Sequence, residues 1–202
     1  MKSRGLPMVL RAALFASTIS LLLFLSAGEQ ASQIPAASEC KEKSRVFLAR
    51  PSKAGLTALS ELGDTACWVE FESSNTNVDK LNNLVERGNR WGAQYLAAHV
   101  SQLDGGNSED ALIALGKFSD HDMERLLVFA KDGLLSKYAF DHAVTMLPLP
   151  LSDDSLAQLK SLSTRRSKVL RIARKDLLEQ KREALTAIDE FAAEVKSDMS
   201  KK

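Results

Sequence analysis

Histidines are the side chains of this chain best suited to metal or acid–base chemistry, and there are three of them. His121 lies between Asp120 and Asp122, and His142 follows Asp141, so two histidine–carboxylate groups stand 21 residues apart. That spacing matches no short ligand motif, such as two histidines four residues apart on one helix. A metal-dependent hydrolase built around His121 and His142 is therefore only an alternative, and we assign no metal ligand.

The sequence lacks the other common catalytic signatures. No serine stands in a Gly-x-Ser-x-Gly elbow, and no glycine loop has the spacing that binds phosphates or dinucleotides. Gly105-Gly106 fits a turn between two helices instead. We therefore expect that the protein is not an enzyme, and we assign no catalytic residue and no cofactor.

Cys40 and Cys67 are the two cysteines of the chain. Two cysteines in an exported protein predict a single disulfide bridge. Closing that loop stabilises a fold by about 3–4 kcal/mol in the chain-entropy model. Two separate small buried thiols are the alternative.

The first 27 residues have the layout of a secretory signal peptide. Lys2, Arg4 and Arg11 give it a positive start, residues 12–27 carry no charge, and Ala27 is the small residue that a signal peptidase requires. Residues 36–38 offer a second cleavage site. The uncharged run has 16 residues, fewer than the roughly 20 that span a bilayer. The sequence predicts a periplasmic or secreted protein, with an uncleaved inner-membrane anchor as the alternative.

Removal of this leader changes the charge balance. The chain has 27 basic and 26 acidic residues, and the leader holds 3 basic residues and no acidic one. The remaining 175 residues therefore carry 24 basic and 26 acidic side chains, a net charge of −2. This balance disfavours nucleic acid as the partner, because nucleic-acid binding normally requires a basic excess.

The predicted organisation is a flexible linker over residues 28–39 and a single helical domain over residues 40–202. Residues 45–49 and 67–71 are rich in β-branched and aromatic side chains. The N-terminal end of the domain is therefore either a small cap that contains strands or a helical segment. We favour the helical start, since two short strands alone are marginally stable.

Five short helices are expected between residues 76 and 150. They begin near Asn77, Asn89, Ser108, Ser119 and Ser136, and they end at glycines 88, 116 and 133, at residues 104–106 and before Pro148. Such helices pack as antiparallel pairs, in a bundle or a short helical array. Residues 88–97 resemble one helix of a Sel1 or tetratricopeptide repeat, but they have no second copy, so no family is inferred from them.

A long helical hairpin or arm is predicted over residues 152–198, which contain neither glycine nor proline. Ser152 caps its first helix, Ser163 and Thr164 interrupt it, and a long helix follows from about residue 165 to residue 197. Apolar residues at near-heptad spacing fit a coiled-coil arm or a helix that lies along its own domain.

Charge is unevenly distributed along this last helix, which is basic in its first half and acidic in its second. Such segregation suits an acidic partner or anionic lipid headgroups, although a solvated helix face is the simpler interpretation. The candidate partner-binding residues are Arg165, Arg166, Lys168, Arg171, Arg174 and Lys175.

These features together predict an exported helical protein that binds another macromolecule. The most specific hypothesis is an immunity-type protein that neutralises a toxin of the cell envelope, with weak association to anionic membrane surfaces as a secondary expectation. A membrane-anchored structural or adaptor protein of the envelope is the alternative from a different class.

Overall fold

The computed structural model describes residues 37–62 and 64–201. The predicted leader, residues 1–27, and most of the predicted linker lie outside this range. The described residues form helices and no strand, which confirms the predicted mainly helical fold. Within them, no helix is both long enough and apolar enough to cross a membrane.

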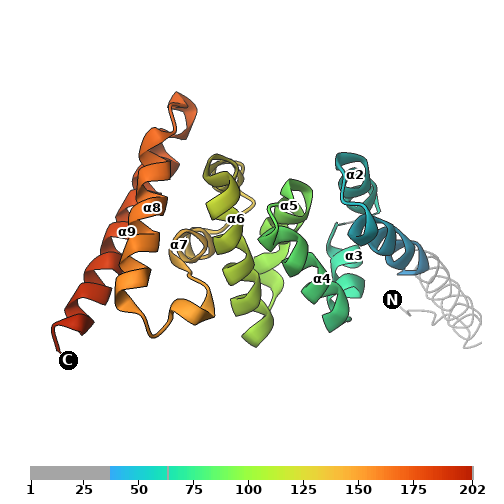
Figure 1. The fold of residues 1–202 in the computed structure, drawn as a ribbon. Coiled ribbons are helices and arrows are strands. Elements are labelled where there is room, and N and C mark those ends of the chain that lie inside the picture. The colour runs from blue at the N-terminus through green and yellow to red at the C-terminus, as the bar shows by residue number, and fades with distance from the viewer. Residues whose placement is uncertain (1–36, 63, 202) are drawn as a thin grey trace, which may run out of the picture.

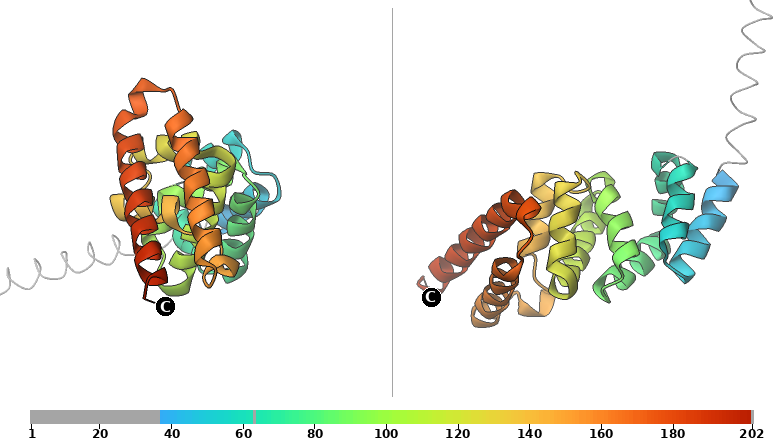
Figure 2. Two further views of the ribbon diagram at one scale, coloured as in Figure 1. Left: turned by 60° about the vertical axis from the view of Figure 1, so that its left-hand side comes forward. Right: turned by 90° about the horizontal axis from the view of Figure 1, so that it is seen from above.

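The helices stand side by side in a row (Figure 1). Seen from above, the row is elongated, and the C-terminal helices lie at the end opposite to residues 37–49 (Figure 2). Short 3₁₀ turns occupy Val100–Gln102, Leu149–Leu151 and Lys175–Leu177. The helices are residues 37–49, α2 (Lys53–Glu61), α3 (Asp64–Glu72), α4 (Asn75–Glu86), α5 (Arg90–His99), α6 (Gly105–Lys131), α7 (Lys137–Thr145), α8 (Ser155–Arg171) and α9 (Leu178–Met199).

The two segments for which strands were an alternative are helical. In α3, Trp68 and Phe71 are fully buried whereas Val69 is 57% exposed. A strand would place residues 69 and 71 on one face, whereas a helix places residues 68 and 71 together. The aromatic and β-branched composition therefore reflects a buried helix face, and the strand-containing cap is wrong.

Two of the short helices begin where the sequence indicated. Asn89 caps α5, because its Oδ1 accepts hydrogen bonds from the amides of Trp91 and Gly92 at 3.1 and 2.9 Å. Ser136 caps α7 in the same way, its Oγ accepting from the amide of Ala139 at 3.2 Å. Both side chains satisfy amides that have no partner inside the helix.

Residues 105–131 form one element where two helices were expected. The chain continues through Gly116 and Ser119, and the non-helical backbone falls at Asp122 (φ −144°, ψ 76°). Asp122 Oδ1 accepts from the amide of Arg125 at 2.9 Å, so Asp122 caps the second half of α6. Ser119 donates to the carbonyl of Gly116 instead of capping a helix.

The C-terminal helices also begin and break at positions other than those predicted. Asp154 rather than Ser152 caps α8, by accepting from the amide of Ala157 at 2.9 Å. The helix continues through Ser163 and Thr164, because the Thr164 hydroxyl donates to the carbonyl one turn earlier and needs no break in the helix. The chain turns at residues 172–177, and α9 returns beside α8 (Figure 1).

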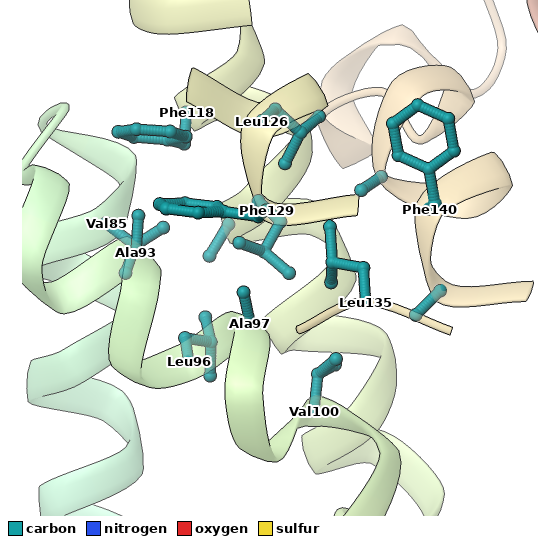
Figure 3. Packing of buried hydrophobic residues seen from close by; sticks show 14 of the residues in the cluster. Val85, Ala93, Leu96, Ala97, Val100, Phe118, Leu126, Phe129, Leu135 and Phe140 are labelled. Carbon is teal, nitrogen blue, oxygen red and sulfur yellow. The ribbon is translucent and has the colours of Figure 1, made fainter. Parts of the chain in front are cut away.

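Buried side chains of α4, α5, α6 and α7 form the centre of the core (Figure 3). Phe118 and Phe129 from the two halves of α6 stack with ring centroids 6.0 Å apart. Phe140 of α7 and Leu96 of α5 are also buried in this cluster. The kink at residue 122 folds α6 back on itself, so both halves contribute to one core.

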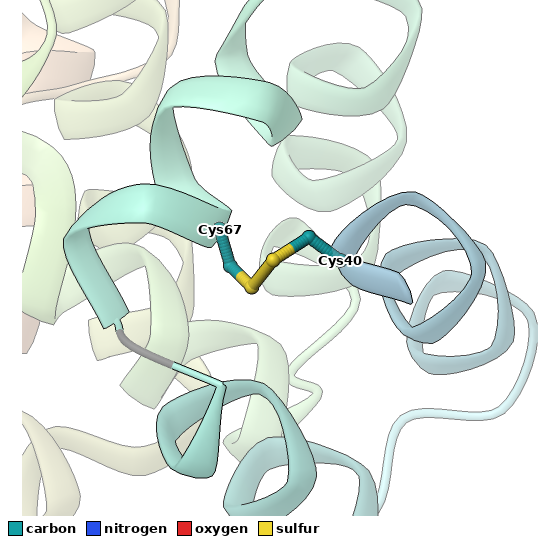
Figure 4. The surroundings of a disulfide bond; sticks show 2 residues. All are labelled: Cys40 and Cys67. Atoms are coloured by element: carbon teal, nitrogen blue, oxygen red, sulfur yellow. A yellow bond between two sulfur atoms is a disulfide. The ribbon is translucent and has the colours of Figure 1, made fainter. Parts of the chain in front are cut away.

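A disulfide joins Cys40, in the helix of residues 37–49, to Cys67 of α3 (Figure 4), as the sequence predicted. It adjoins a buried aromatic cluster in which Trp68 stacks on Phe71 and His99, with centroids 5.4 and 4.4 Å away. The bridge therefore fixes the first helix of the row against the aromatic part of the core.

Removal of the bridge should destabilise the protein. For the C40A/C67A variant we expect the free energy of unfolding in urea to fall by about 3–4 kcal/mol, because the unfolded chain regains the entropy of an open 27-residue loop. Dithiothreitol should lower the stability of the wild type to a similar extent and leave the variant unchanged. A wild type that is insensitive to the reductant would contradict the bridge.

Candidate functional site

A groove of about 630 Å³ lies between α7, α9 and the segment that follows α7. Its apolar lining comes from that segment and from α9, where Phe191 also packs against the core. Carboxylates from three elements border it: Glu109 of α6, Asp141 of α7, and Glu190 and Glu194 of α9. The remaining apolar lining is Met146, Leu147, Pro148, Leu149 and Ala187.

Proline shapes the segment that lines the groove. Pro148 cannot continue a helix, so α7 ends at Thr145 and the chain runs on to a single 3₁₀ turn at Leu149–Leu151. The last carbonyls of α7 therefore receive no hydrogen bond from the backbone amides of a further helical turn. Leu149 is left 63% exposed beside the groove.

Arg165 of α8 supplies the missing donors. Its side chain is fully buried, and Nη1 donates to the carbonyls of Val144 and Met146 at 3.1 and 2.7 Å. Nη2 donates to the carbonyl of Gly116 at 2.8 Å, and Nε and Nη2 form a two-pronged pair with Asp120 at 3.1 and 2.9 Å. Five hydrogen bonds match the five donors of a guanidinium group. They tie α6, α7 and α8 together behind the groove.

Gly116 allows this close approach. A Cβ at this position would lie 2.5 Å from the carbonyl oxygen of Met146, closer than real Cβ contacts. The glycine that the sequence indicated as a helix end is therefore a contact point between α6 and the segment after α7.

A second hollow, of about 410 Å³, adjoins the groove between α4 and the first half of α6. Leu149 lines both the groove and this second hollow. The second hollow is also lined by three further carboxylates, those of Asp79, Glu86 and Asp110. Its lysine, Lys117, is paired with Glu86 at 2.8 Å. Across the two hollows the lining thus contains seven carboxylates and one lysine.

This arrangement is suited to binding a positively charged, partly apolar group. The carboxylates attract a cation, and the apolar lining can bury the side chains beside it. Of the groove carboxylates, Asp141 accepts from Lys137 at 2.7 Å, and this hydrogen bond raises the pKa of Lys137. The other oxygen of Asp141 is buried and has no hydrogen-bond partner among the described residues.

Most of the candidate partner-binding residues are engaged within the chain. Arg165 is buried, so its assignment to an accessible surface is wrong. Arg166 pairs with Asp189 of α9 at 2.8 Å, and Lys168 donates to the carbonyl of Asp120 at 2.6 Å. These side chains hold α8 against α6 and α9.

The other three candidate partner-binding residues, Arg171, Arg174 and Lys175, lie at the turn between α8 and α9. Arg174 pairs with Asp176 at 2.6 Å, and together with Lys131 it holds the pKa of Asp176 well below its ordinary value. Arg171 and Lys175 are exposed, and no interaction with the described residues engages either side chain.

The buried role of Arg165 had a signal in the sequence. Leu162, Arg165 and Val169 are spaced at three and four residues, and all three are buried. Residues at this spacing share one face of a helix. An arginine on an apolar face indicates a buried donor rather than a solvated cation.

The three histidines contact different parts of the molecule. His99 stacks on Trp68 in the core. His121 Nε2 lies 3.0 Å from the carbonyl oxygen of Glu86 in α4, and His142 lies against Tyr138 and lines the groove. Over residues 37–62 and 64–201, no group of three or more histidine, cysteine or acidic side chains is placed to hold a metal ion.

Comparison of the chain with protein-family models, with curated proteins and with solved structures gives no significant match.

Loss of the Arg165 hydrogen bonds should destabilise the region behind the groove. The R165M variant keeps most of the side-chain volume but leaves the carbonyls of Val144 and Met146 without their donor and the Asp120 carboxylate without its closest partner. We expect the free energy of unfolding to fall by about 3–5 kcal/mol, because each buried carbonyl that loses its donor costs about 1–3 kcal/mol. Urea unfolding followed by circular dichroism measures this loss.

The matched control is R166M, which removes the neighbouring arginine and its exposed pair with Asp189. Exposed pairs contribute little because water and salt screen them, so R166M should unfold close to the wild type. Equal losses in the two variants would show that Arg165 has no special role.

Proposed function

We propose that the protein is exported and binds another protein through the groove between α7 and α9, as an immunity-type protein that neutralises a toxin of the cell envelope. The observation that supports this proposal best is the groove itself, where four carboxylates border a lining of apolar side chains. Such a surface combines apolar area for affinity with charge for partner selection.

The binding surface in this proposal differs from the one that the sequence favoured. The basic residues of α8 are largely paired with neighbouring helices, whereas the groove carboxylates face a hollow with few cations. A partner with basic side chains beside apolar ones complements this face. Inhibition then consists of covering part of the partner's surface and needs no chemical step.

Export is supported by the bridge between Cys40 and Cys67. Disulfides persist in oxidising compartments and are rare where thiols are kept reduced. This agrees with the leader-like pattern of residues 1–27.

Charge reversal in the groove tests the proposed binding surface. Co-expression with the product of the neighbouring gene should give a complex that purifies together and cells that are protected from the partner's toxicity. The E190K/E194K variant should weaken the complex on the order of a hundredfold, because like charges across an interface cost several kcal/mol. Calorimetry or a pull-down titration measures this change.

The matched control is E61K/D132K, which makes the same change of net charge at exposed residues outside the groove. It should bind as the wild type does. If no complex and no protection are found, the immunity proposal fails; if both variants bind normally, the protein binds through another surface.

The exported form should begin downstream of the leader. N-terminal sequencing of protein purified from the cell envelope should give Gly28, the residue after Ala27, or Glu39 if the second site is used. The uncharged run is too short to favour a membrane span, so cleavage is the expected outcome. A mature protein that still begins at Met1 and sediments with membranes would support the anchored alternative instead.

A further inference from the structure

The turn between α8 and α9 projects beyond the ends of the neighbouring helices (Figures 1 and 2). It comprises the end of α8, residues 172–174, the 3₁₀ turn Lys175–Leu177 and the start of α9. We call residues 170–182 the hairpin tip. Because of its position, the tip can contact a flat surface without interference from the rest of the row.

The hairpin tip exposes two large apolar side chains. Leu170 is 51% exposed and Leu178 is 64% exposed. Both line one shallow hollow between α8 and α9, with Arg182 at the tip and Asp189 and Glu190 further along α9. Neither leucine is needed in the core, because Val169 and Leu177 beside them are fully buried there.

The hairpin tip is also rich in basic residues. The hairpin tip contains five basic residues and two acidic ones, Asp176 and Glu179. Asp176 is already engaged by Arg174 and Lys131, at 2.6 and 2.7 Å. Arg171 and Lys175 are exposed, and the part of the chain that the structure describes gives them no such counter-charge.

Exposed leucines among unpaired cations match the chemistry of an anionic bilayer surface. Apolar side chains enter the boundary between headgroups and acyl chains, while lysine and arginine attract the negative headgroups. An acidic protein surface would satisfy the cations, but it gives no reason for two solvent-exposed leucines on a projecting turn. The lipid surface therefore fits both observations.

We propose that the hairpin tip is a second binding surface, separate from the groove, which docks the protein on membranes that contain anionic phospholipid. The contact is peripheral and reversible, since a few basic residues and two leucines provide only modest affinity. It would keep a protein at the surface on which its partner acts.

Vesicle sedimentation tests the hairpin tip directly. The purified protein is mixed at low salt with vesicles of phosphatidylcholine and phosphatidylglycerol, and with vesicles of phosphatidylcholine alone. The vesicles that contain phosphatidylglycerol should retain the protein more strongly than those of phosphatidylcholine alone, and added salt should release most of the bound protein. The R171Q/K175Q variant should bind about thirtyfold more weakly, because each basic residue near the surface contributes about fivefold in affinity.

The matched control is K160Q/K196Q, which removes the same charge from exposed lysines near the other end of the hairpin. It should sediment as the wild type does. The L170S/L178S variant keeps every charge and should lose the part of the binding that survives added salt.

Two results would overturn the proposal. The first is that the wild type binds the anionic vesicles no better than the neutral ones at low salt. The other is an equal loss of binding in R171Q/K175Q and K160Q/K196Q, which would indicate net charge rather than the hairpin tip. A tip variant that loses vesicle binding but still forms the partner complex would show that the two surfaces act independently.

Discussion

The buried guanidinium of Arg165 is the interaction on which the C-terminal half of the structure depends. It donates to three backbone carbonyls, from Gly116, Val144 and Met146, and pairs with Asp120. Desolvating a charge is costly, and the cost is offset here because every donor is used. An apolar side chain of the same volume would avoid that cost, but it cannot satisfy carbonyls at the end of α7 that lack helical partners. Pro148 ends α7, and the arginine holds that end of α7 in place beside the groove.

The sequence predicted the helical fold and the disulfide, because both follow from local patterns. Apolar spacing, the helix starts at Asn89 and Ser136, and the two cysteines needed no knowledge of distant contacts. The breaks in α6 and between α8 and α9 were harder to predict. Gly116 resembled a helix end, yet its role is to accommodate the carbonyl of Met146, which lies thirty residues further along the chain.

The candidate site was also hard to predict from the sequence, because it depends on contacts between distant parts of the chain. A run of basic residues suggested a free surface, but tertiary contacts decide whether each cation is solvated. Arg166 and Arg174 pair with Asp189 and Asp176, whereas no counter-charge within residues 37–62 and 64–201 pairs with Arg171. The groove was not predicted at all. Its carboxylates come from three helices, and no short segment of sequence brings Glu109, Asp141 and Glu194 together.

The charge order along α9 is not explained by helix stability. The helix dipole acts on the first and last turns, and Glu179 and Lys196 already have the favourable signs there. Along the helix, however, like charges stand four residues apart at residues 179 and 183, 190 and 194, and 194 and 198. Each such pair destabilises a helix by about 0.2–0.5 kcal/mol, whereas alternating signs would stabilise it.

The acidic second half of α9 does have a structural consequence. Glu190 and Glu194 border the groove, whereas the cations of the hairpin tip lie mostly on α8 and in the turn before α9. The opposite charges of the two surfaces therefore come from different elements of the hairpin. Alternating charges in the second half of α9 would place cations at the border of the groove, so the like charges at residues 190 and 194 keep that border acidic at a local cost in helix stability.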